Sequence, residues 1–380
     1  MEILRRKVEA IMAMEGVASF SSPLEFVLHL CSLAYGAIVR MRTSFYKNGI
    51  LKSKRLSCKV ISIGNLTVGG TGKTPLAMYT ANMLKRAGCR LVIISRGYGG
   101  NAEKTGGIVS NGKTIRMSAE QAGDEPYLMA TRLAEIPVMV GSHRYPIGKQ
   151  AIVSFHPDIL LLDDAFQHIQ LQRDLDLCLC DAKKPFGNGY LFPRGMLREP
   201  VAHLRRADAV VLTCGQRSND VSTSVKMIQK YIPGKPIFSC FYRPTEFREP
   251  AAHGQTHHVE ILTGRKILAF SGIAQNDKFA AILSELGGHI VKFIPFSDHH
   301  WYTNSEVTQI LRIAQDLRVD YIVTTEKDYV RIGKRLSSSF PTLILVISLS
   351  FGKDTEAFEN FVRGTLGLTA GAKSARQDFK

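Results

Sequence analysis

The segment from Ile63 to Thr74 (IGNLTVGGTGKT) constrains the fold of this chain more than any other feature. The apolar run Val60–Ile63 leads into it, and a helical pattern from Pro75 to Ala87 follows it and stops at Gly88. A strand, a glycine-rich turn, Lys-Thr and a helix form the context of a phosphate-binding P-loop. The chain therefore predicts a βα unit that holds a polyphosphate at the helix N-terminus.

The residues of this loop have separate expected roles. The glycines let backbone N–H groups approach the phosphates, Lys73 neutralises the β- and γ-phosphates, and the Thr74 hydroxyl holds Mg²⁺. Thr67 stands where the usual pattern has Gly, and a glycine-rich turn without function is the alternative. The predicted ATP-binding residues of the loop are Thr67, Val68, Gly69, Gly70, Thr71, Gly72, Lys73 and Thr74.

Short apolar runs alternate with polar or helical stretches along the chain. The first strand candidates are Lys59–Ile63, Arg90–Ser95, Pro137–Val140, Asp158–Asp163, Leu175–Asp181 and Asp208–Thr213. Because these runs are continuously apolar, we expect a P-loop NTPase-like parallel sheet flanked by helices. The second series is Pro236–Tyr242, Lys266–Ser271, His289–Phe296, Tyr321–Thr325 and Thr342–Ser348, interleaved with helical patterns at Asn276–Leu286 and Ser305–Leu317. It predicts a second, smaller α/β domain.

The length of 380 residues also favours more than one domain. We expect an N-terminal extension with a membrane-associating helix over 1–42 and a P-loop domain over 43–232. The smaller α/β domain is expected over 233–352, and a helix or tail, partly disordered, over 353–380. Turn residues at Pro233-Gly234 mark the junction.

Composition narrows the surroundings of the protein. Seven cysteines, with no pair at zinc-site spacing, predict buried reduced thiols in a cytoplasmic protein. The net charge of +16 calls for a polyanionic partner or surface. Nucleotide, nucleic acid, acidic phospholipid and phosphorylated substrate all meet that condition, and composition does not choose among them.

The segment Ser22–Met41 has a helical pattern with a wide apolar face. Glu25 and His29 interrupt it, and its apolar part is shorter than the ~20 residues of a membrane-spanning helix. Basic residues follow at Arg40, Arg42, Lys47, Lys52, Lys54 and Arg55. This order predicts a helix in the interface of an anionic leaflet. A core helix and a signal peptide are alternatives, although export would separate the P-loop from cytoplasmic ATP.

Two adjacent carboxylates, Asp163-Asp164, close the apolar run Ile159–Leu162. A carboxylate at the carboxyl end of a central parallel strand, beside a P-loop, is placed to hold Mg²⁺ directly or through water. Capping of the strand or of a following helix is the alternative, and spacing does not say which Asp contacts the metal. Gln167 and His168 follow and are candidates for orienting nucleotide or metal waters, with simple packing as the alternative for His168.

Further blocks occur in a characteristic order. After the P-loop come Ser95–Gly100 (SRGYGG), Gly123–Pro126 (GDEP), Asp163–His168 (DDAFQH), Arg194-Gly195 with Arg198–Pro200 (REP), Asp298-His299 and Thr324–Asp328 (TTEKD). In these blocks the chain resembles the tetraacyldisaccharide 4'-kinases of lipid A biosynthesis, from about residue 24 to 330. Ala165 stands where the family commonly has Gly.

The resemblance implies roles for individual residues. It assigns Asp124 to the catalytic base and His299 to its partner; in our domain assignment the two lie in different domains, which would have to close. An N-cap role is the alternative for Asp124. It implies substrate contacts for Arg96, Tyr98, Arg144, Arg194 and Arg198, each arginine having a solvated surface role as its alternative. Lys327 and Asp328 are candidates for an interdomain pair without a chemical role.

Together these implications describe an ATP- and Mg²⁺-dependent kinase that is peripheral (monotopic) on the cytoplasmic face of the inner membrane. Its substrate would be a tetraacylated glucosamine disaccharide 1-phosphate, phosphorylated at the 4'-hydroxyl; no obligate protein partner is inferred. The alternative is a membrane-associated P-loop switch or partition ATPase. A nucleic-acid-binding ATPase is disfavoured, because the basic residues cluster beside the apolar helix without aromatic stacking residues.

Overall fold

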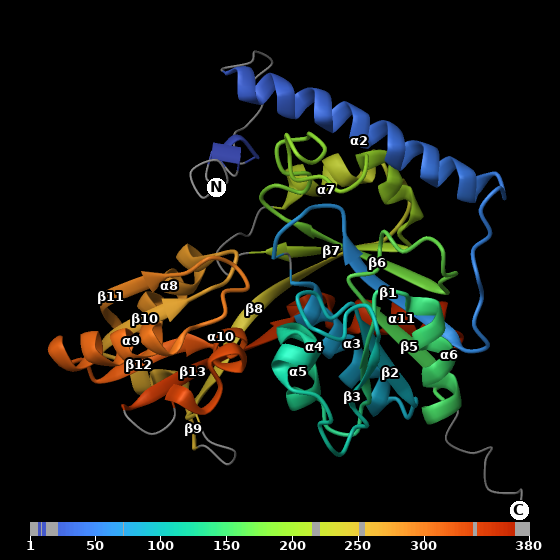
Figure 1. Ribbon diagram of the computed structural model, residues 1–380. Coiled ribbons are helices and arrows are strands. Elements are labelled where there is room, and N and C mark those ends of the chain that lie inside the picture. Colours follow the sequence, from blue (N-terminus) through green and yellow to red (C-terminus); the bar gives the residue numbers. More distant parts are fainter. Residues whose placement is uncertain are drawn as a thin grey trace, which may run out of the picture. The chain divides into compact units, whose positions relative to one another are not determined.

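The computed structural model describes residues 7–8, 10–12, 22–70, 72–214, 221–250, 255–336 and 340–368, without the side chain of residue 334. The chain forms two compact units (Figure 1). The first unit comprises Met1–Ser95, His143–Phe241 and Ser350–Lys380, and the second comprises Arg96–Ser142 and Tyr242–Leu349. The predicted boundaries differ from this division: the chain leaves the first unit after residue 95, returns at 143, and returns again at 350.

The first unit is built on a parallel sheet in the order β7-β6-β1-β5-β2. Its strands are β1 (Lys59–Asn65), β2 (Leu91–Ser95), β5 (Ile159–Asp163), β6 (Leu175–Asp181) and β7 (Ala209–Cys214). Nearly all their residues are buried on both faces, as continuously apolar runs require. In the β1–β5 register Ile63 lies opposite Asp163, so the P-loop and the carboxylate pair begin at the same edge of the sheet.

Helices cover this sheet. α3 (Lys73–Arg86) and α6 (Arg144–Phe155) connect the strands, and α7 (Ser222–Gln229) and α11 (Thr355–Thr365) complete the unit with the 3₁₀ turn η1 (Val201–Arg206). α3 buries Leu76, Ala81 and Leu84 with exposures of zero, which fixes it against β1 and β5. The long α2 (Pro23–Lys47, blue in Figure 1) starts at the N-cap Ser22, whose hydroxyl accepts from the backbone N–H of Glu25.

The second unit contains four neighbouring parallel strands, in the order β11-β10-β12-β13. The strands are β10 (Lys266–Ser271), β11 (His289–Pro295), β12 (Tyr321–Thr325) and β13 (Thr342–Ser350), and β8 (Ile237–Arg248) runs from the first unit into the second, where it pairs with β9 (Thr256–His257). The accompanying elements are α4 (Ala119–Ala122), α5 (Asp124–Arg132), α8 (Asn276–Glu285), α9 (Asn304–Asp316), α10 (Glu326–Ile332) and the antiparallel pair β3 (Gly107–Ser110) and β4 (Val138–Val140).

Most predicted strands are confirmed to within two residues at either end, because each carries a buried apolar run. β8 extends past the predicted Tyr242, and α2 continues past the predicted Met41 to Lys47. We expected the apolar N-terminal segment to be too short to span a bilayer. This expectation is wrong, because α2 has 25 residues and is long and apolar enough to cross a membrane by length and composition alone. α11 occupies part of the predicted C-terminal tail, whereas Thr71 and residues 369–380 lie outside the described residues.

Candidate active site

The P-loop runs from the end of β1 to the start of α3. Gly72 precedes the helix in the left-handed region (φ 89°), the conformation that starts α3 at Lys73. A segment distant in sequence holds the loop from outside. The N–H of Val68 donates to the carbonyl of Met196 (2.7 Å), and the N–H of Arg198 donates to the carbonyl of Leu66 (2.7 Å). These bonds fix the approach to the phosphate site before any ligand binds.

Two residues at the start of this loop are closely packed against neighbouring segments. Thr67 is buried and its backbone forms an isolated antiparallel bridge with Leu197. Gly64 lies so close to the carboxylate segment that a Cβ there would be 2.5 Å from the backbone nitrogen of Phe166. Only glycine therefore permits β1 and residues 163–166 to pack together at the edge that carries the site.

The carboxylate pair lies beside Lys73. Asp163 is fully buried at the end of β5, and Ser95 Oγ is 3.5 Å from its Oδ2. Asp164 has φ 49°, and its Oδ1 is 3.6 Å from Lys73 Nζ, while both its oxygens accept from Arg198 NH1 (2.9 and 3.1 Å). Burial raises the pKa of Asp164, but the charges of Lys73 and Arg198 outweigh it and lower the pKa below its ordinary value.

Three further polar residues support this edge. Gln167 Nε2 donates to the carbonyl of Asn65 (2.8 Å), and Lys73 Nζ donates to Asn65 Oδ1 (3.4 Å). Arg144, buried at the start of α6, donates to the carbonyl of Asp163 (3.3 Å). Asn65 was not among the predicted site residues, although its position between the strand and the loop was a usable signal. Burial and the nearby arginines lower the pKa of His168 to about 3, so its imidazole is neutral.

The oxygen ligands here suit Mg²⁺, a hard cation that keeps several waters and phosphate oxygens in its shell. They are the Thr74 hydroxyl, which is buried, and the carboxylates of Asp163 and Asp164. Among the described residues no group of three or more His, Cys, Asp or Glu side chains forms a metal site alone.

The second constellation lies within the second unit. Asp124 is the first residue of α5, and its buried Oδ2 is 2.9 Å from His299 Nδ1, after β11. Its other oxygen, Oδ1, accepts the backbone N–H of Glu125 (2.8 Å), so a helix-start contact and the histidine contact coexist. The expectation that two domains must close to bring Asp124 and His299 together is wrong, because both residues belong to one unit.

The electrostatics of this pair follow from its neighbours. Burial raises the pKa of Asp124, but the His299 bond and the charges of Lys327 and Arg331 outweigh it and lower the pKa to about 2. The Asp124 hydrogen bond raises the pKa of His299 above its ordinary value, although burial opposes this. The two groups are coupled and titrate as a pair.

The TTEKD block contributes to the same constellation. Lys327, which is half-buried, forms an ion pair with Glu125. Burial lowers the pKa of its ammonium, but the charges of Glu125 and Asp124 outweigh it and raise the pKa above its ordinary value. Asp328 pairs with Arg331 (3.4 Å), whose Nε is also 3.3 Å from Asp124 Oδ2. The interdomain pair expected of Lys327 and Asp328 is therefore replaced by contacts inside the second unit. Arg331 was missed, because nothing in the sequence separates it from a surface arginine.

The residues expected to contact substrate lie in different surroundings. Tyr98 is 62% exposed, and its ring lies 5.7 Å from that of His299. Arg96 lies over Tyr98 (5.9 Å) and pairs with Glu103 (2.6 Å). Arg194 is buried, by contrast, and pairs with Glu25 of α2 (3.0 Å).

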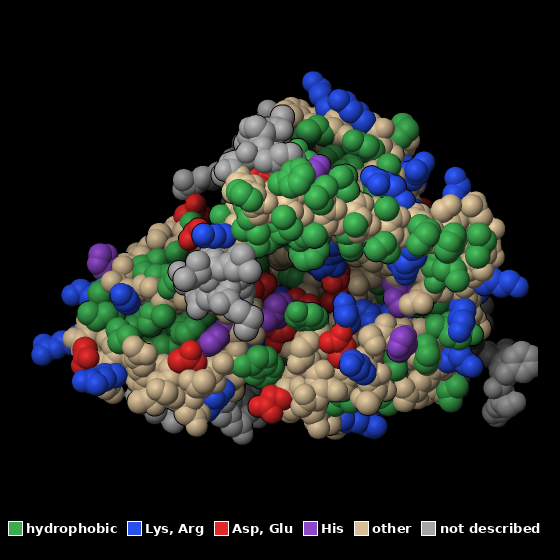
Figure 2. Space-filling model, turned by 45° about the horizontal axis from the view of Figure 1, so that its top comes forward, with side chains coloured by type: hydrophobic (Ala, Val, Ile, Leu, Met, Phe, Trp, Pro, Cys, Tyr) green, Lys and Arg blue, Asp and Glu red, His purple; other side chains and the backbone are tan. Residues whose placement is uncertain are grey.

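α2 has two different long sides. Toward the protein, Ser32 Oγ donates to the carbonyl of Leu191 (2.8 Å), and Tyr35 OH donates to that of Arg198 (2.8 Å). Only 17% of the most apolar 18-residue stretch of α2 is buried, and hydrophobic side chains gather over this helix in Figure 2. Its large exposed apolar residues are Phe26, Val27, Leu30, Leu33, Ile38 and Met41, with 47–59% exposure.

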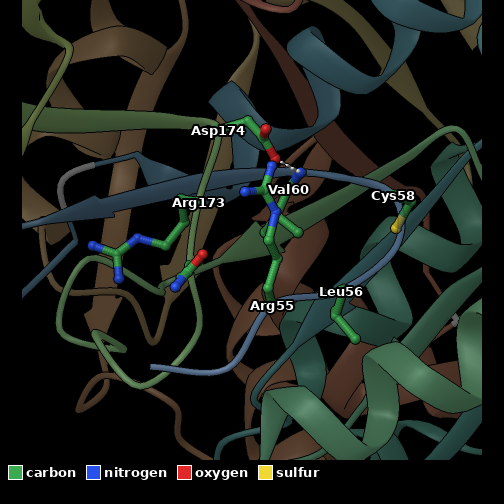
Figure 3. A pocket seen from close by; sticks show the side chains of 7 residues that line it. Arg55, Leu56, Cys58, Val60, Arg173 and Asp174 are labelled. Carbon is green, nitrogen blue, oxygen red and sulfur yellow. Dashed lines mark hydrogen bonds between the residues drawn. The ribbon is translucent and has the colours of Figure 1, made fainter. Parts of the chain in front are cut away.

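A small pocket of about 80 Å³ lies near the start of β1, where Arg55, Cys58 and Asp174 contribute to its lining (Figure 3). Asp174 accepts the backbone N–H of Val60 (2.9 Å), and Lys59 lies 3.1 Å from it. β1 leads from this end toward the P-loop at its other end, so the pocket is separate from the phosphate site.

Comparison with known proteins identifies the family. A family model described as tetraacyldisaccharide-1-P 4'-kinase matches residues 24–367. A tetraacyldisaccharide 4'-kinase of Desulfatibacillum aliphaticivorans is 40% identical, covering 97% of this chain and 100% of the relative, and one of Syntrophus aciditrophicus is 39% identical, covering 90% and 93%. The crystal structure of LpxK from Aquifex aeolicus in complex with ATP is 33% identical, with a TM-score of 0.71, and covers 90% of this chain and 99% of that one. The predicted fold class is thus confirmed, and the chain belongs to the tetraacyldisaccharide-1-phosphate 4'-kinase family.

Proposed function

We propose that this protein transfers the γ-phosphoryl group of ATP to the 4'-hydroxyl of a tetraacylated glucosamine disaccharide 1-phosphate. The observation that carries the proposal is the partly buried Asp124–His299 contact of 2.9 Å in a chain that also has a P-loop. A nucleotide switch needs only to position a water molecule, whereas a kinase must receive the proton of an acceptor hydroxyl. The relatives named above are kinases of this class.

The first unit supplies the phosphate end of the reaction. Backbone N–H groups of the P-loop and the ammonium of Lys73 bind the phosphates. The guanidinium of Arg198, which donates to Asp164, is a second positive charge at this edge. Thr74, Asp163 and Asp164 would hold Mg²⁺, which would supply charge neutralisation to the phosphates. Arg144 and Gln167 hold the backbone of Asp163 and Asn65 in place.

The second unit supplies the acceptor end. The 4'-oxygen forms its bond to the γ-phosphorus while the bond between that phosphorus and the bridging oxygen breaks, and ADP leaves. The hydroxyl proton passes to Asp124. A carboxylate with a pKa near 2 is a weak base alone, and His299, whose pKa is raised, shares the proton within the pair. We therefore assign phosphate binding to the first unit and proton acceptance to the second.

The residues predicted to contact substrate fall into two groups according to the solvent exposure of their side chains. Arg96 and Tyr98 are open to solvent, and the Tyr98 ring lies beside His299, so we expect both residues to meet the phosphorylated sugar directly. Arg144, Arg194 and Arg198 are held by the protein's own oxygens, and we expect them to act mainly through those groups.

α2 fits a peripheral position on the cytoplasmic face of the inner membrane. Glu25, Ser32 and Tyr35 hold one side of the helix to the first unit, so lipid cannot surround it as it would a spanning helix. Its outer apolar side suits burial in the acyl boundary, and the basic residues after it suit anionic headgroups.

Mass spectrometry of a reaction with ATP, Mg²⁺ and the disaccharide 1-phosphate tests the function. The expected product has gained one phosphate, which partial deacylation and fragmentation place on the 4'-position. ATP hydrolysis that continues without any phosphorylated lipid product would favour the switch ATPase instead. A reaction without ATP and one with Lys73→Ala are the controls.

A further inference from the structure

Arg331 lies at the centre of the second unit's polar contacts. It belongs to α10, and its side chain is fully buried. Its Nε lies 3.3 Å from Asp124 Oδ2, and its NH2 lies 3.4 Å from Asp328 Oδ1. One guanidinium thus joins the base of the proposed reaction to a second buried carboxylate.

The same side chain also holds the turn that carries His299. Arg331 NH1 donates to the carbonyls of Gly272 (2.9 Å) and His300 (3.2 Å). The Gly272 carbonyl also accepts the N–H of His299 (3.2 Å), whose backbone is left-handed (φ 58°). This conformation is costly for a residue other than glycine, so it persists only where surrounding contacts hold it.

We propose that Arg331 is a positioning residue for phosphoryl transfer, which fixes Asp124 and the His299 turn against each other. The inference rests on the proposed function for its role in turnover, but its structural part does not. Nothing in the family comparison assigns a role to this residue.

The geometry requires arginine rather than any cation. A guanidinium presents several N–H donors in a rigid plane, so it reaches two carboxylates and three carbonyls at once, since Nε also donates to the carbonyl of Lys327 (3.1 Å). A lysine ammonium is a single point and cannot span these groups. Asp328 lies beside the NH2 group of this guanidinium and is itself held in place, since it also accepts from Tyr302 OH (2.7 Å) and from the N–H of Gly272 (2.9 Å).

Other charged groups also act on the pair, and the test must separate them from Arg331. The charged groups that face Asp124 are His299, Lys327 and Arg331. The charged groups that face His299 are Asp124, Asp298 and Lys327, and the Tyr98 ring lies alongside. Arg331→Lys keeps the positive charge, so a change in the variant reports lost position rather than lost charge.

Histidine-selective NMR titration of the full chain provides the test that does not depend on activity. In Arg331→Lys we expect the pKa of His299 to fall toward the ordinary value of ~6.5, because the turn no longer holds the imidazole against Asp124. The matched control is Arg335→Lys: Arg335 donates to the carbonyls of Tyr302 and Arg331, and we expect this variant to keep the raised pKa. A His299 pKa in Arg331→Lys that equals or exceeds that of the control would overturn the inference.

Kinetics give the second arm. We expect Arg331→Lys to lower kcat by roughly 10- to 100-fold while the KM for ATP stays within about twofold, since the first unit binds nucleotide. The loss of kcat should vanish when Arg331→Lys is made in the His299→Ala protein. An equal loss of kcat with and without His299 would mean a general structural defect and would refute a positioning role. If the wild-type protein transfers no phosphate, the proposed function fails, and the NMR arm still decides the role of Arg331 in holding the pair.

Discussion

Replacing Asp124 by Asn removes the charge and the basicity of this residue while keeping its size. The amide oxygen can still accept the N–H of Glu125, which now stands 2.8 Å from Asp124 Oδ1. Lys327 keeps its ion pair with Glu125, and Arg331 keeps Asp328. The substitution therefore leaves no buried cation without a carboxylate, and the larger cost of a broken buried pair, about 3–5 kcal/mol, does not apply.

The expected loss of stability follows from the pKa of Asp124, which is about 2 in the folded protein against an ordinary 3.8. By proton linkage, this difference corresponds to about 2 kcal/mol of folding free energy at pH 7. Since the folded pKa is the lower one, the contribution is present above pH 3.8 and is lost as pH falls toward 2. The difference between wild type and variant should be about halved near pH 3.

Urea unfolding of both proteins from pH 7 down to pH 3 measures this difference, and steady-state kinetics measure turnover. We expect kcat to fall by roughly 10²- to 10⁴-fold, the usual effect of removing a general base. The affinity for ATP should not change, because the P-loop and Asp163-Asp164 are intact. A stability difference independent of pH would refute the electrostatic reasoning, and lost ATP binding would place Asp124 in the metal site.

Three further predictions follow from the same contacts. Lys73→Ala should abolish turnover in a folded protein, because phosphoryl transfer depends on charge neutralisation; a near-normal kcat would remove the P-loop assignment. Leu30→Gln with Leu33→Gln, at positions 49% and 54% exposed, should weaken sedimentation with anionic liposomes without changing the unfolding free energy, and unchanged sedimentation would exclude α2 as the anchor. The rate kcat should rise with pH through a pKa above 6.5, because an imidazolium at His299 holds Asp124 in an ion pair; this limb should disappear in His299→Ala, and its persistence there would assign it to another group.

Local patterns in the sequence predicted the elements whose physics is local. The P-loop is contiguous, so its glycines, Lys73 and Thr74 reveal a strand, turn and helix without long-range information. Continuous apolar runs likewise predicted strands buried on both faces, and the carboxylate pair predicted at the end of one run lies at the same edge of the sheet as the P-loop. These inferences held because a few successive residues fix each of them.

Tertiary structure decided which distant residues meet. Residues 96–142 join the second unit, so Asp124 contacts His299 across 175 positions of sequence without domain closure. Arg194 binds Glu25 rather than standing free, and Arg331 contacts two carboxylates and three carbonyls around the Asp124–His299 pair. No short-range period encodes such contacts, because burial and the path of the chain between units select the partner of each charge. The sequence by itself determined the P-loop, and the three-dimensional packing determined the contact between Asp124 and His299.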